Sequence, residues 1–394
     1  MKAPAKSSAS SWRVASTRTP SSASPASPAA ASPRRSESEG GGEGGIFSLL
    51  AEHEHEQVSC WYEPSSGYRG LIAIHNTTLG PALGGTRFWN YTSDREALID
   101  ALRLSRGMTY KAAVAGLNLG GGKSVILGDN KTTWREAIFR AHGRHIESLG
   151  GRYITAEDVG TGPADMELIR AETEHVTGLM GKSGDPSPVT AYGVYRGIKA
   201  CAKHRYGSDS LSGKTVTVQG CGHVGYFLCK LLFQEGATLI VTDLDPLRVK
   251  AVVQDFRATA VAPDHIYGQQ ADIFAPCALG AVINDDTLKV LRVDIIAGGA
   301  NNQLAEDRHG ALVEEQGMVY APDYVINGGG LINVNAELHG WSLERARNKA
   351  GEIYDTILRV FEISKQEKIP SYQAADRLAQ HRIAAIAKVR QNFV

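Results

Sequence analysis

The chain has 394 residues, and its 42 lysines and arginines equal its 42 aspartates and glutamates, so it carries no formal net charge. This balance gives no electrostatic attraction to nucleic acid or to an anionic membrane, and no apolar run approaches the ~20 residues that span a bilayer. The five cysteines form no C-x-x-C pair, which favours a reducing compartment and argues against structural zinc. We therefore predict a cytoplasmic protein of about two domains, with no metal site and with no nucleic-acid or membrane partner.

The first 45 residues are rich in serine, alanine, proline and glycine and cannot bury a hydrophobic core. No acidic residue occurs before Glu37, a bias that is typical of organelle transit peptides. However, four prolines between Pro20 and Pro33 would break the amphipathic helix of such a peptide. We predict an unstructured extension over residues 1–45, with an organelle-targeting segment as the less favoured alternative.

Strands and helices alternate from residue 46 to residue 183, which predicts an α/β domain. Apolar alternation and β-branched residues indicate the strands, while a Ser93–Glu96 capping box and a helical apolar period indicate the first long helix. In chain order we expect a solvated first helix that includes residues 53–56, a strand at 69–78, a helix at 93–105, a strand at 123–129, a helix at 134–151 and a strand at 152–158.

A second α/β unit follows a hinge that is predicted at 184–189, where two prolines and a glycine separate patterned segments. The domain limits that we expect are 184–333 for this unit and 334–394 for C-terminal helices that return to the first domain. The elements are a helix at 190–204, a strand at 214–220, a helix at 223–236, a strand at 237–243, further pairs to 318–325, and two long helical patterns at 334–365 and 371–391.

A dinucleotide-binding fingerprint, G-x-G-x-x-G, occurs at Gly220, Gly222 and Gly225. It follows a predicted strand, opens a helix and leads to a second strand that ends near Asp243, which is the context of a Rossmann NAD site. Asp243 would accept hydrogen bonds from the adenine ribose, and residues 244–246 offer no arginine for a 2′-phosphate, so NAD is favoured over NADP. A glycine turn that only packs a strand on a helix is the alternative.

A second glycine-rich stretch, "GLNLGGGKSVI" at 116–126, resembles the end of a phosphate-binding P-loop. A P-loop must open a helix so that the helix N-terminus faces the anion. The residues after Lys123 are β-branched and predict a strand instead, and Leu117 stands where the pattern needs glycine. A P-loop hydrolase is therefore disfavoured.

Two lysines, Lys111 and Lys123, lie twelve positions apart among small residues that would leave room for a ligand. Burial near a second cation lowers the pKa of a lysine and lets it act as a general base, whereas a lysine that stays charged suits a substrate carboxylate. Asp158, at the end of the next predicted strand, is placed to relay protons. Patterning alone leaves open the alternative of two ordinary exposed lysines.

Several long blocks resemble one enzyme family, the leucine/valine/phenylalanine branch of the amino-acid dehydrogenases, from about residue 46 to residue 390. The blocks include "GPALGGTRFW", "SRGMTYKAAVAGLNLGGGKSVILGD", "GRYITAEDVGT", "PSPVTAYGVYRG", "ANNQL" and "YAPDYVIN". The resemblance implies two α/β domains with a cleft between them, the first binding substrate and forming oligomers and the second binding NAD. It implies oxidative deamination of an L-amino acid to a 2-oxo acid and ammonium, in a homo-oligomer.

The resemblance also implies roles for individual residues. Lys111 would bind the substrate carboxylate, Lys123 would activate the attacking water, and Asp158 would manage protons on the amine. Gly84 and Gly85 would line the substrate site, whereas Thr190, Asn301 and Asn327 would lie near the nicotinamide end of the cofactor. The side-chain pocket would be apolar and formed by Leu83, Met108, Leu331 and Val334.

Some positions depart from the family pattern. Leu331 stands where valine is expected in a leucine-specific member, Gly328 replaces an alanine, Gly299 replaces a serine, and Asp185 stands where asparagine is usual. One methylene in an apolar pocket changes preference by only ~10–200-fold. We therefore expect a branched-chain substrate, leucine with valine and isoleucine, and keep two alternatives: an aromatic amino-acid dehydrogenase and a nucleotide-binding sensor without catalysis.

Overall fold

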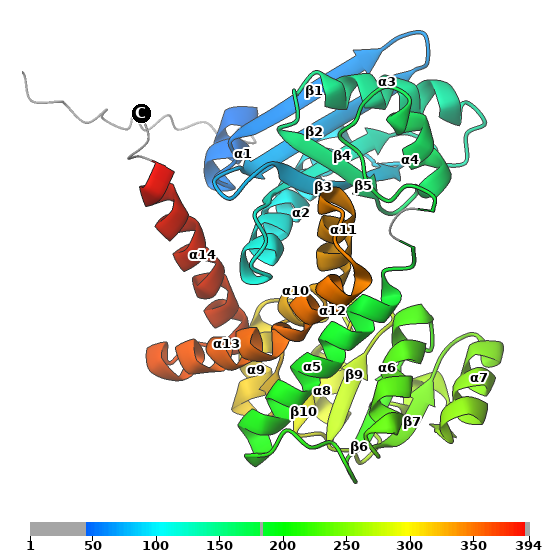
Figure 1. Ribbon diagram of the computed structural model, residues 1–394, viewed down its shortest axis with the longest axis vertical. Coiled ribbons are helices and arrows are strands. Elements are labelled where there is room, and N and C mark those ends of the chain that lie inside the picture. The colour runs from blue at the N-terminus through cyan, green and yellow to red at the C-terminus, as the bar shows by residue number, and fades with distance from the viewer. Residues whose placement is uncertain (1–44, 182–183, 391–394) are drawn as a thin grey trace, which may run out of the picture. The chain divides into compact units, whose positions relative to one another are not determined.

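The computed structural model describes residues 45–181 and 184–390, and Figure 1 labels most of their helices and strands. Within these ranges no helix is both long enough and apolar enough to cross a membrane. The predicted extension over residues 1–45 lies outside the described residues, except for Gly45.

The first sheet in the described part of the chain is mixed and has five strands. Its spatial order is β1-β2-β4-β3-β5, with β1–β2 and β2–β4 antiparallel and with β3 parallel to both β4 and β5. The strands are β1 (Gln57–Glu63), β2 (Tyr68–Asn76), β3 (Ala82–Trp89), β4 (Gly120–Leu127) and β5 (Tyr153–Glu157). The helices of this region are α1 (Ile46–Glu52), α2 (Asp94–Val114), α3 (Arg135–Glu147) and α4 (Pro163–Arg170).

Helix α2 covers one face of this sheet, and α3 and α4 cover the other. Successive strand residues point to opposite faces: Val125 of β4 packs with Ala97 and Leu98 of α2, whereas Ile126 packs with Phe139 of α3. Lys123, two positions before Val125, therefore projects on the α2 face. The chain pattern that predicted a strand here was correct, but the strand begins at Gly120, so its glycines belong to β4.

The second sheet contains six strands among the described residues, all paired in parallel, in the order β11-β10-β9-β6-β7-β8. The strand order changes direction at β6: β7 and β8 lie on one side of it, and β9, β10 and β11 lie on the other. Ligands of such folds bind at this switch point. The strands are β6 (Thr215–Gln219), β7 (Thr238–Thr242), β8 (Thr259–Ala260), β9 (Ile273–Pro276), β10 (Ile295–Ile296) and β11 (Val319–Tyr320). The helices are α5 (Ser187–Tyr206), α6 (His223–Gln234), α7 (Pro246–Phe256), α8 (Asp285–Val290), α9 (Arg308–Glu315) and α10 (Asp323–Ile326), with a 3₁₀ turn at Pro263–His265. The predicted fold class, an N-terminal α/β domain followed by a Rossmann-type domain, is confirmed, and the first sheet is found to be mixed.

The C-terminal region differs from the two long helical patterns that were predicted. The first pattern, 334–365, is interrupted, because Gly340 adopts a left-handed conformation with φ 62° and ends α11. Ser342 then caps the next helix by accepting the N–H of Arg345 at 3.2 Å. The helices are α11 (Gly329–His339), α12 (Leu343–Gly351), α13 (Ile353–Glu367) and α14 (Ser371–Arg390).

Helix α14 contacts α2 of the first region. Arg382 donates to the carbonyl oxygen of Leu117 at 2.7 Å, and Gln380 donates to the hydroxyl of Tyr110 at 3.1 Å. The end of the chain therefore touches the helix that carries Lys111. The domain limits remain predictions.

Three local expectations need correction. The side chain of Glu96 accepts the N–H of Thr92 at 2.9 Å and not that of Ser93, so only half of the predicted capping box forms. Helix α5 begins at Ser187, so the second half of the predicted hinge is helical. Residues 53–56, expected in a first helix, follow α1, and the described residues contain no cluster of His, Cys, Asp and Glu that could hold a metal ion.

Candidate active site

Lys123 and Asp158 form the centre of the candidate site. The Nζ atom of Lys123, a residue only 5% exposed, lies 2.5 Å from Oδ2 of Asp158, which follows β5. Strand β3 separates β4 from β5, so the contact crosses β3. A Cβ atom on Gly85 would lie 2.8 Å from Cβ of Asp158 and 2.6 Å from the carbonyl oxygen of Glu157. The glycine therefore lets the two charged groups meet over an intervening strand.

Gly84 approaches the backbone of β4 closely, since a Cβ there would lie 1.7 Å from the carbonyl oxygen of Gly122. Its own carbonyl oxygen accepts the buried Tyr153 hydroxyl at 2.6 Å. Tyr153 also donates to Oγ of Ser124 at 3.1 Å, next to Lys123 in the chain. Through these two hydrogen bonds Tyr153 joins its own strand, β5, to β3 and β4.

The charges of the pair suit proton transfer. Burial lowers the pKa of Lys123, and the neighbouring charge of Asp158 offsets only part of this effect. Burial alone would raise the pKa of Asp158, but the charges and hydrogen bonds of Lys123 and Arg87 hold it below its ordinary value. A lysine whose neutral form is accessible, beside a carboxylate that stays ionised, can take a proton from water.

Lys111 lies in the last turn of α2 and is half-buried. Burial lowers its pKa to about 8, an effect that the charge of Asp323 partly opposes. Among the described residues no hydrogen bond to the Lys111 ammonium is present, so it is available for a carboxylate of a ligand. Asp323 is itself held by the backbone N–H groups of Gln303 (3.0 Å) and Tyr324 (2.6 Å).

The four predicted pocket residues belong to one apolar cluster. Leu83 and Leu331 are 1% and 6% exposed within it, and Met108 and Val334 pack against it while remaining partly buried. Leu331 and Val334 are three positions apart on α11 and therefore share a face. Ile154 of β5, which pairs in register with Leu83, packs against the same cluster and was not predicted.

The glycine fingerprint lies where β6 turns into α6. Gly220 has φ +101°, and a Cβ on Gly225 would lie 1.9 Å from the carbonyl oxygen of Gly220, so both must lack side chains. Asp243 accepts the N–H of Cys221 at 2.7 Å, which ties the end of β7 to the turn. A Cβ on Gly222 would meet only Arg248, at 3.6 Å, so the backbone at the start of α6 is open to a phosphate.

Three residues predicted near the nicotinamide lie close to one another or to the start of α11. Asn327 donates to Oδ1 of Asn301 at 2.7 Å. Thr190 donates to the carbonyl oxygen of Pro186 at 2.9 Å. A Cβ on Gly329 would lie 2.7 Å from the Cα atom of Thr190. The buried Oδ1 atom of Asn327 has no hydrogen-bond partner in the described part of the chain. This acceptor fits a ligand that offers an N–H group, such as a carboxamide.

Comparisons with known proteins identify the family of the chain. The model of the Glu/Leu/Phe/Val dehydrogenase dimerisation domain matches residues 53–175, and that of the Glutamate/Leucine/Phenylalanine/Valine dehydrogenase family matches residues 181–246 and 246–391. The chain belongs to the glutamate/leucine/phenylalanine/valine dehydrogenase family. It is an amino-acid dehydrogenase, as the sequence resemblance predicted.

Individual relatives and solved structures show how similar the chain is to single members of the family. A leucine dehydrogenase of Thermoactinomyces intermedius is 58% identical over 352 residues, covering 89% of this chain and 96% of the relative. An L-tryptophan dehydrogenase of Nostoc punctiforme is 47% identical over 341 residues, covering 86% and 96%. The crystal structure of L-tryptophan dehydrogenase from Nostoc punctiforme has a TM-score of 0.81 at 45% identity, covering 87% of this chain and 100% of that one. A glutamate dehydrogenase structure from Peptoniphilus asaccharolyticus, at 21% identity and TM-score 0.69, shares the fold.

Sequence reasoning missed several residues around the site of this dehydrogenase. Arg87 donates to Oδ2 of Asp158 at 3.0 Å, and its other end binds Asp100 at 2.7 Å. Arg87 follows Gly85 by two positions and so shares its face of β3, a signal that the alternation of the strand already contained. The electrostatic effect of Asp323 on Lys111 had no such signal, because the two residues are far apart in the chain.

Proposed function

We propose that this enzyme catalyses the reversible, NAD-dependent oxidative deamination of L-leucine, and of L-valine and L-isoleucine, to the 2-oxo acid and ammonium. The observation that carries the proposal is the buried Lys123–Asp158 pair on the α2 face of the first sheet. Lys111 on α2 and the apolar cluster of Leu83 and Leu331 add a carboxylate partner and a side-chain pocket. The 58% identity with leucine dehydrogenases supports leucine as the substrate.

Each residue of the site has a step in the proposed reaction. The Lys111 ammonium binds the substrate carboxylate and orients Cα, which makes the chemical step nearly unimolecular. NAD, when bound, accepts the hydride from Cα. Neutral Lys123 then takes a proton from the water that attacks the resulting imine carbon. Asp158 receives and returns protons at the amino nitrogen, which leaves as ammonium.

The cofactor proposal depends on the second sheet. Gly220, Gly222 and Gly225 would admit the pyrophosphate, Asp243 the adenine ribose, and Thr190, Asn301 and Asn327 the carboxamide end. NAD is preferred over NADP because Asp243 would repel a 2′-phosphate. We propose the same domain limits as above, namely 46–183, 184–333 and 334–394, and a cytoplasmic location.

An aromatic substrate is the second candidate, because Leu331 departs from the valine expected in a leucine-specific enzyme. The tryptophan and phenylalanine dehydrogenases among the relatives show that this family accepts larger side chains. They are less similar to this chain than the leucine dehydrogenases, at 47% and 43% identity against 58%. Leucine therefore remains the first proposal.

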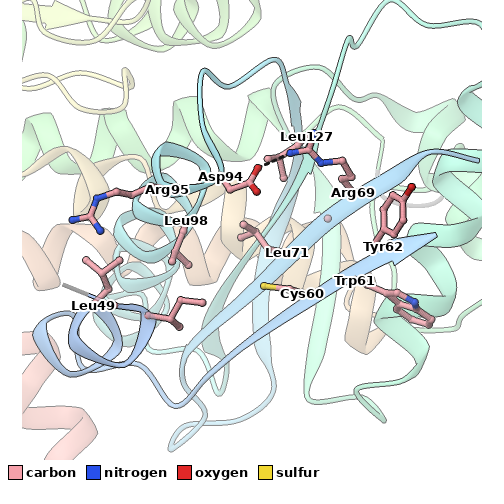
Figure 2. A pocket seen from close by; sticks show the side chains of 13 residues that line it. Leu49, Cys60, Trp61, Tyr62, Arg69, Leu71, Asp94, Arg95, Leu98 and Leu127 are labelled. Carbon is pink, nitrogen blue, oxygen red and sulfur yellow. Dashed lines mark hydrogen bonds and ion pairs between the residues drawn. The ribbon is translucent and has the colours of Figure 1, made fainter. Parts of the chain in front are cut away.

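A homo-oligomer is proposed to form through the edge of the first sheet. Strand β1 lies at the end of the sheet order, and its Trp61 and Tyr62 are 36% and 64% exposed. An apolar cavity of about 670 Å³ lies beside it, with Leu49, Leu71 and Leu98 among its lining residues, and Figure 2 shows these side chains. An edge strand next to an exposed apolar patch suits a second copy of the chain, and the matching family model is described as a dimerisation domain.

Light scattering tests this assembly. We expect a mass above that of one chain, and we expect Trp61→Lys to reduce it. Val290→Lys, at a 45% exposed apolar residue of α8, should leave the mass unchanged. A monomeric wild type, or a Trp61 variant with the wild-type mass, would contradict the proposal.

NADH formation with a panel of L-amino acids tests the activity. The expected order of kcat/KM is leucine first, with valine and isoleucine next and phenylalanine below them. The panel is repeated with NADP, where a lower rate is expected. A chain that binds NAD but forms no NADH with any amino acid would be a sensor and not an enzyme.

A further inference from the structure

Asp158 is bound from two sides through one oxygen atom. Its Oδ2 accepts from Nζ of Lys123 at 2.5 Å and from Nε of Arg87 at 3.0 Å. Among residues 45–181 and 184–390, no hydrogen bond to Oδ1 is present. Two charged donors on one oxygen fix the plane of the carboxylate and leave the second oxygen available.

Arg87 is held at its other end by α2. Its Nη1 donates to Oδ2 of Asp100 at 2.7 Å, and the Tyr91 hydroxyl donates to the same oxygen at 2.7 Å. Arg103 approaches the other oxygen of Asp100 at 3.3 Å. The side chains of Arg87 and Asp100 are 22% and 14% exposed, so the chain of contacts is only partly open to water.

The sheet register explains why Arg87 reaches Asp158. β3 pairs in parallel with β5, with Thr86 opposite Glu157, so the next residue on each strand is Arg87 and Asp158. On the other side of β3, Arg87 pairs with Val125, two residues after Lys123. A planar guanidinium can span two carboxylates in this position, whereas an ammonium is a single point of charge.

We propose that Arg87, anchored by Asp100, is a positioning residue for the reaction, which orients the Asp158 carboxylate toward Lys123. This inference rests on the roles proposed above for Lys123 and Asp158. Arg87 touches Asp158 and not the reacting atoms. Its removal should therefore lower kcat more than it changes binding.

The charged groups around Lys123 change its pKa in opposite directions. Arg87 on β3 lowers the pKa of Lys123, whereas Asp158 after β5 and Asp100 on α2 raise it. On β2, the residue opposite Lys123 is the apolar Ala73. Loss of the positive charge should thus raise the pKa of Lys123, and loss of the Asp100 charge should lower it.

The test measures kcat for leucine and NAD against pH in Arg87→Met, Arg87→Lys and Asp100→Asn. We expect Arg87→Met to lose about 10- to 100-fold in kcat, with its acid limb at higher pH and with the KM for leucine little changed. Arg87→Lys keeps the charge but not the planar fork, so its limb should stay in place while kcat recovers partly. Asp100→Asn should move the limb to lower pH.

A matched control exists in the second region of the chain. Arg205 donates to Asp294 at 2.7 Å, and the Tyr206 hydroxyl donates to the other oxygen of Asp294 at 2.9 Å. Arg205→Met should leave kcat and the acid limb unchanged. It thus separates a general loss of stability from the positioning of Asp158.

Three outcomes would overturn the inference. The first is an Arg87→Met enzyme that matches Arg205→Met in kcat and pH profile. The second decides the matter if Arg87→Met does not fold. It is an Asp100→Asn enzyme whose kcat and acid limb match those of the wild type. The third is a wild type that forms no NADH with any amino acid, which also overturns the proposed function. If the wild type is active and the Arg87 and Asp100 variants keep its kcat and pH profile, only the positioning role of Arg87 is excluded.

Discussion

Gly85 and Asp158 approach each other so closely that a methyl group on the glycine would lie 2.8 Å from Cβ of the aspartate. The glycine lies on β3, between the strand of Lys123 and the strand that leads to Asp158. A side chain there would collide with Asp158, whose carboxylate accepts from the Lys123 ammonium at 2.5 Å. The shortest contact of the site therefore depends on a missing side chain.

Gly85→Ala should separate Lys123 from Asp158 and lower kcat by about 100-fold, because small displacements of reacting groups have effects of this size. The added Cβ would also lie 2.6 Å from the carbonyl oxygen of Glu157, so β3 or β5 has to shift. Steady-state kinetics with leucine and NAD measure the loss.

Gly268→Ala is the matched control, since a Cβ there would meet nothing within 4 Å. It should have wild-type kinetics and a similar unfolding midpoint. Wild-type kcat in the Gly85 variant would contradict the idea that this glycine permits the catalytic contact.

The sequence predicted the parts of the fold that local patterns determine. The Rossmann turn was predictable because its glycines, its strand and its helix are neighbours in the chain, and Gly220 and Gly225 do make the close approach expected of them. Lys123 could be assigned to a strand because the β-branched residues after it exclude a helix start. These inferences needed no knowledge of which strands pair.

Other features depend on pairing between distant segments. The contact between Arg87 and Asp158 follows from the order β4-β3-β5, which no short stretch of sequence reveals. The break at Gly340 was missed because the apolar helical period continues on both sides of it. The charge of Asp323 near Lys111 likewise joins residues more than 200 positions apart.

Lys111 should give the enzyme an alkaline limb. Its pKa is lowered by burial to about 8, so the free enzyme loses the ammonium charge as the pH rises through this value. Because the charged form binds the substrate carboxylate in the proposed function, kcat/KM for leucine should fall above about pH 8. A pH series of kcat/KM measures it.

Lys111→Arg separates the charge from the shape of the group. Arginine stays protonated throughout this range, so the alkaline limb should move to higher pH while kcat/KM near neutrality falls. Lys203→Arg, at an exposed lysine of α5, should keep the wild-type limb. An alkaline limb that is the same in Lys111→Arg and in the wild type would exclude Lys111 as its origin.

Acid should destabilise the first region through its histidines. Burial lowers the pKa of His75 to about 3 and those of His55 and His145 to about 4, from an ordinary value of 6.5. Between pH 6.5 and about 4 the unfolded chain binds protons that the folded chain does not. The free energy of unfolding therefore rises with pH in this window, and stability is lost on acidification.

Urea unfolding at several pH values measures this slope. His75→Gln should reduce the loss between pH 6.5 and pH 4, because one fewer proton is taken up on unfolding. His265→Gln, at an exposed histidine, should retain the wild-type slope. Equal slopes in the wild type and the His75 variant would show that this histidine is protonated in the folded state.

Leu331 should set the size of the substrate side chain that the enzyme accepts. It is 6% exposed, belongs to the same apolar cluster as Leu83, and shares a helix face with the partly buried Val334. Leu331→Val removes one methylene, and a change of this size in an apolar pocket shifts preference by ~10–200-fold at most. Because valine is the residue expected here in a leucine-specific enzyme, we expect the ratio of kcat/KM for phenylalanine over leucine to fall by about 10-fold.

Ile332→Val removes the same methylene from the neighbouring residue, which is 1% exposed in the same cluster. Adjacent residues of a helix point about 100° apart, so Ile332 should not line the pocket with Leu331. Each variant should lose only about 0.5–1.5 kcal/mol of stability, so both should fold. A changed substrate ratio in Leu331→Val alone would assign specificity to this face of α11, whereas equal ratios in the two variants would move the pocket elsewhere.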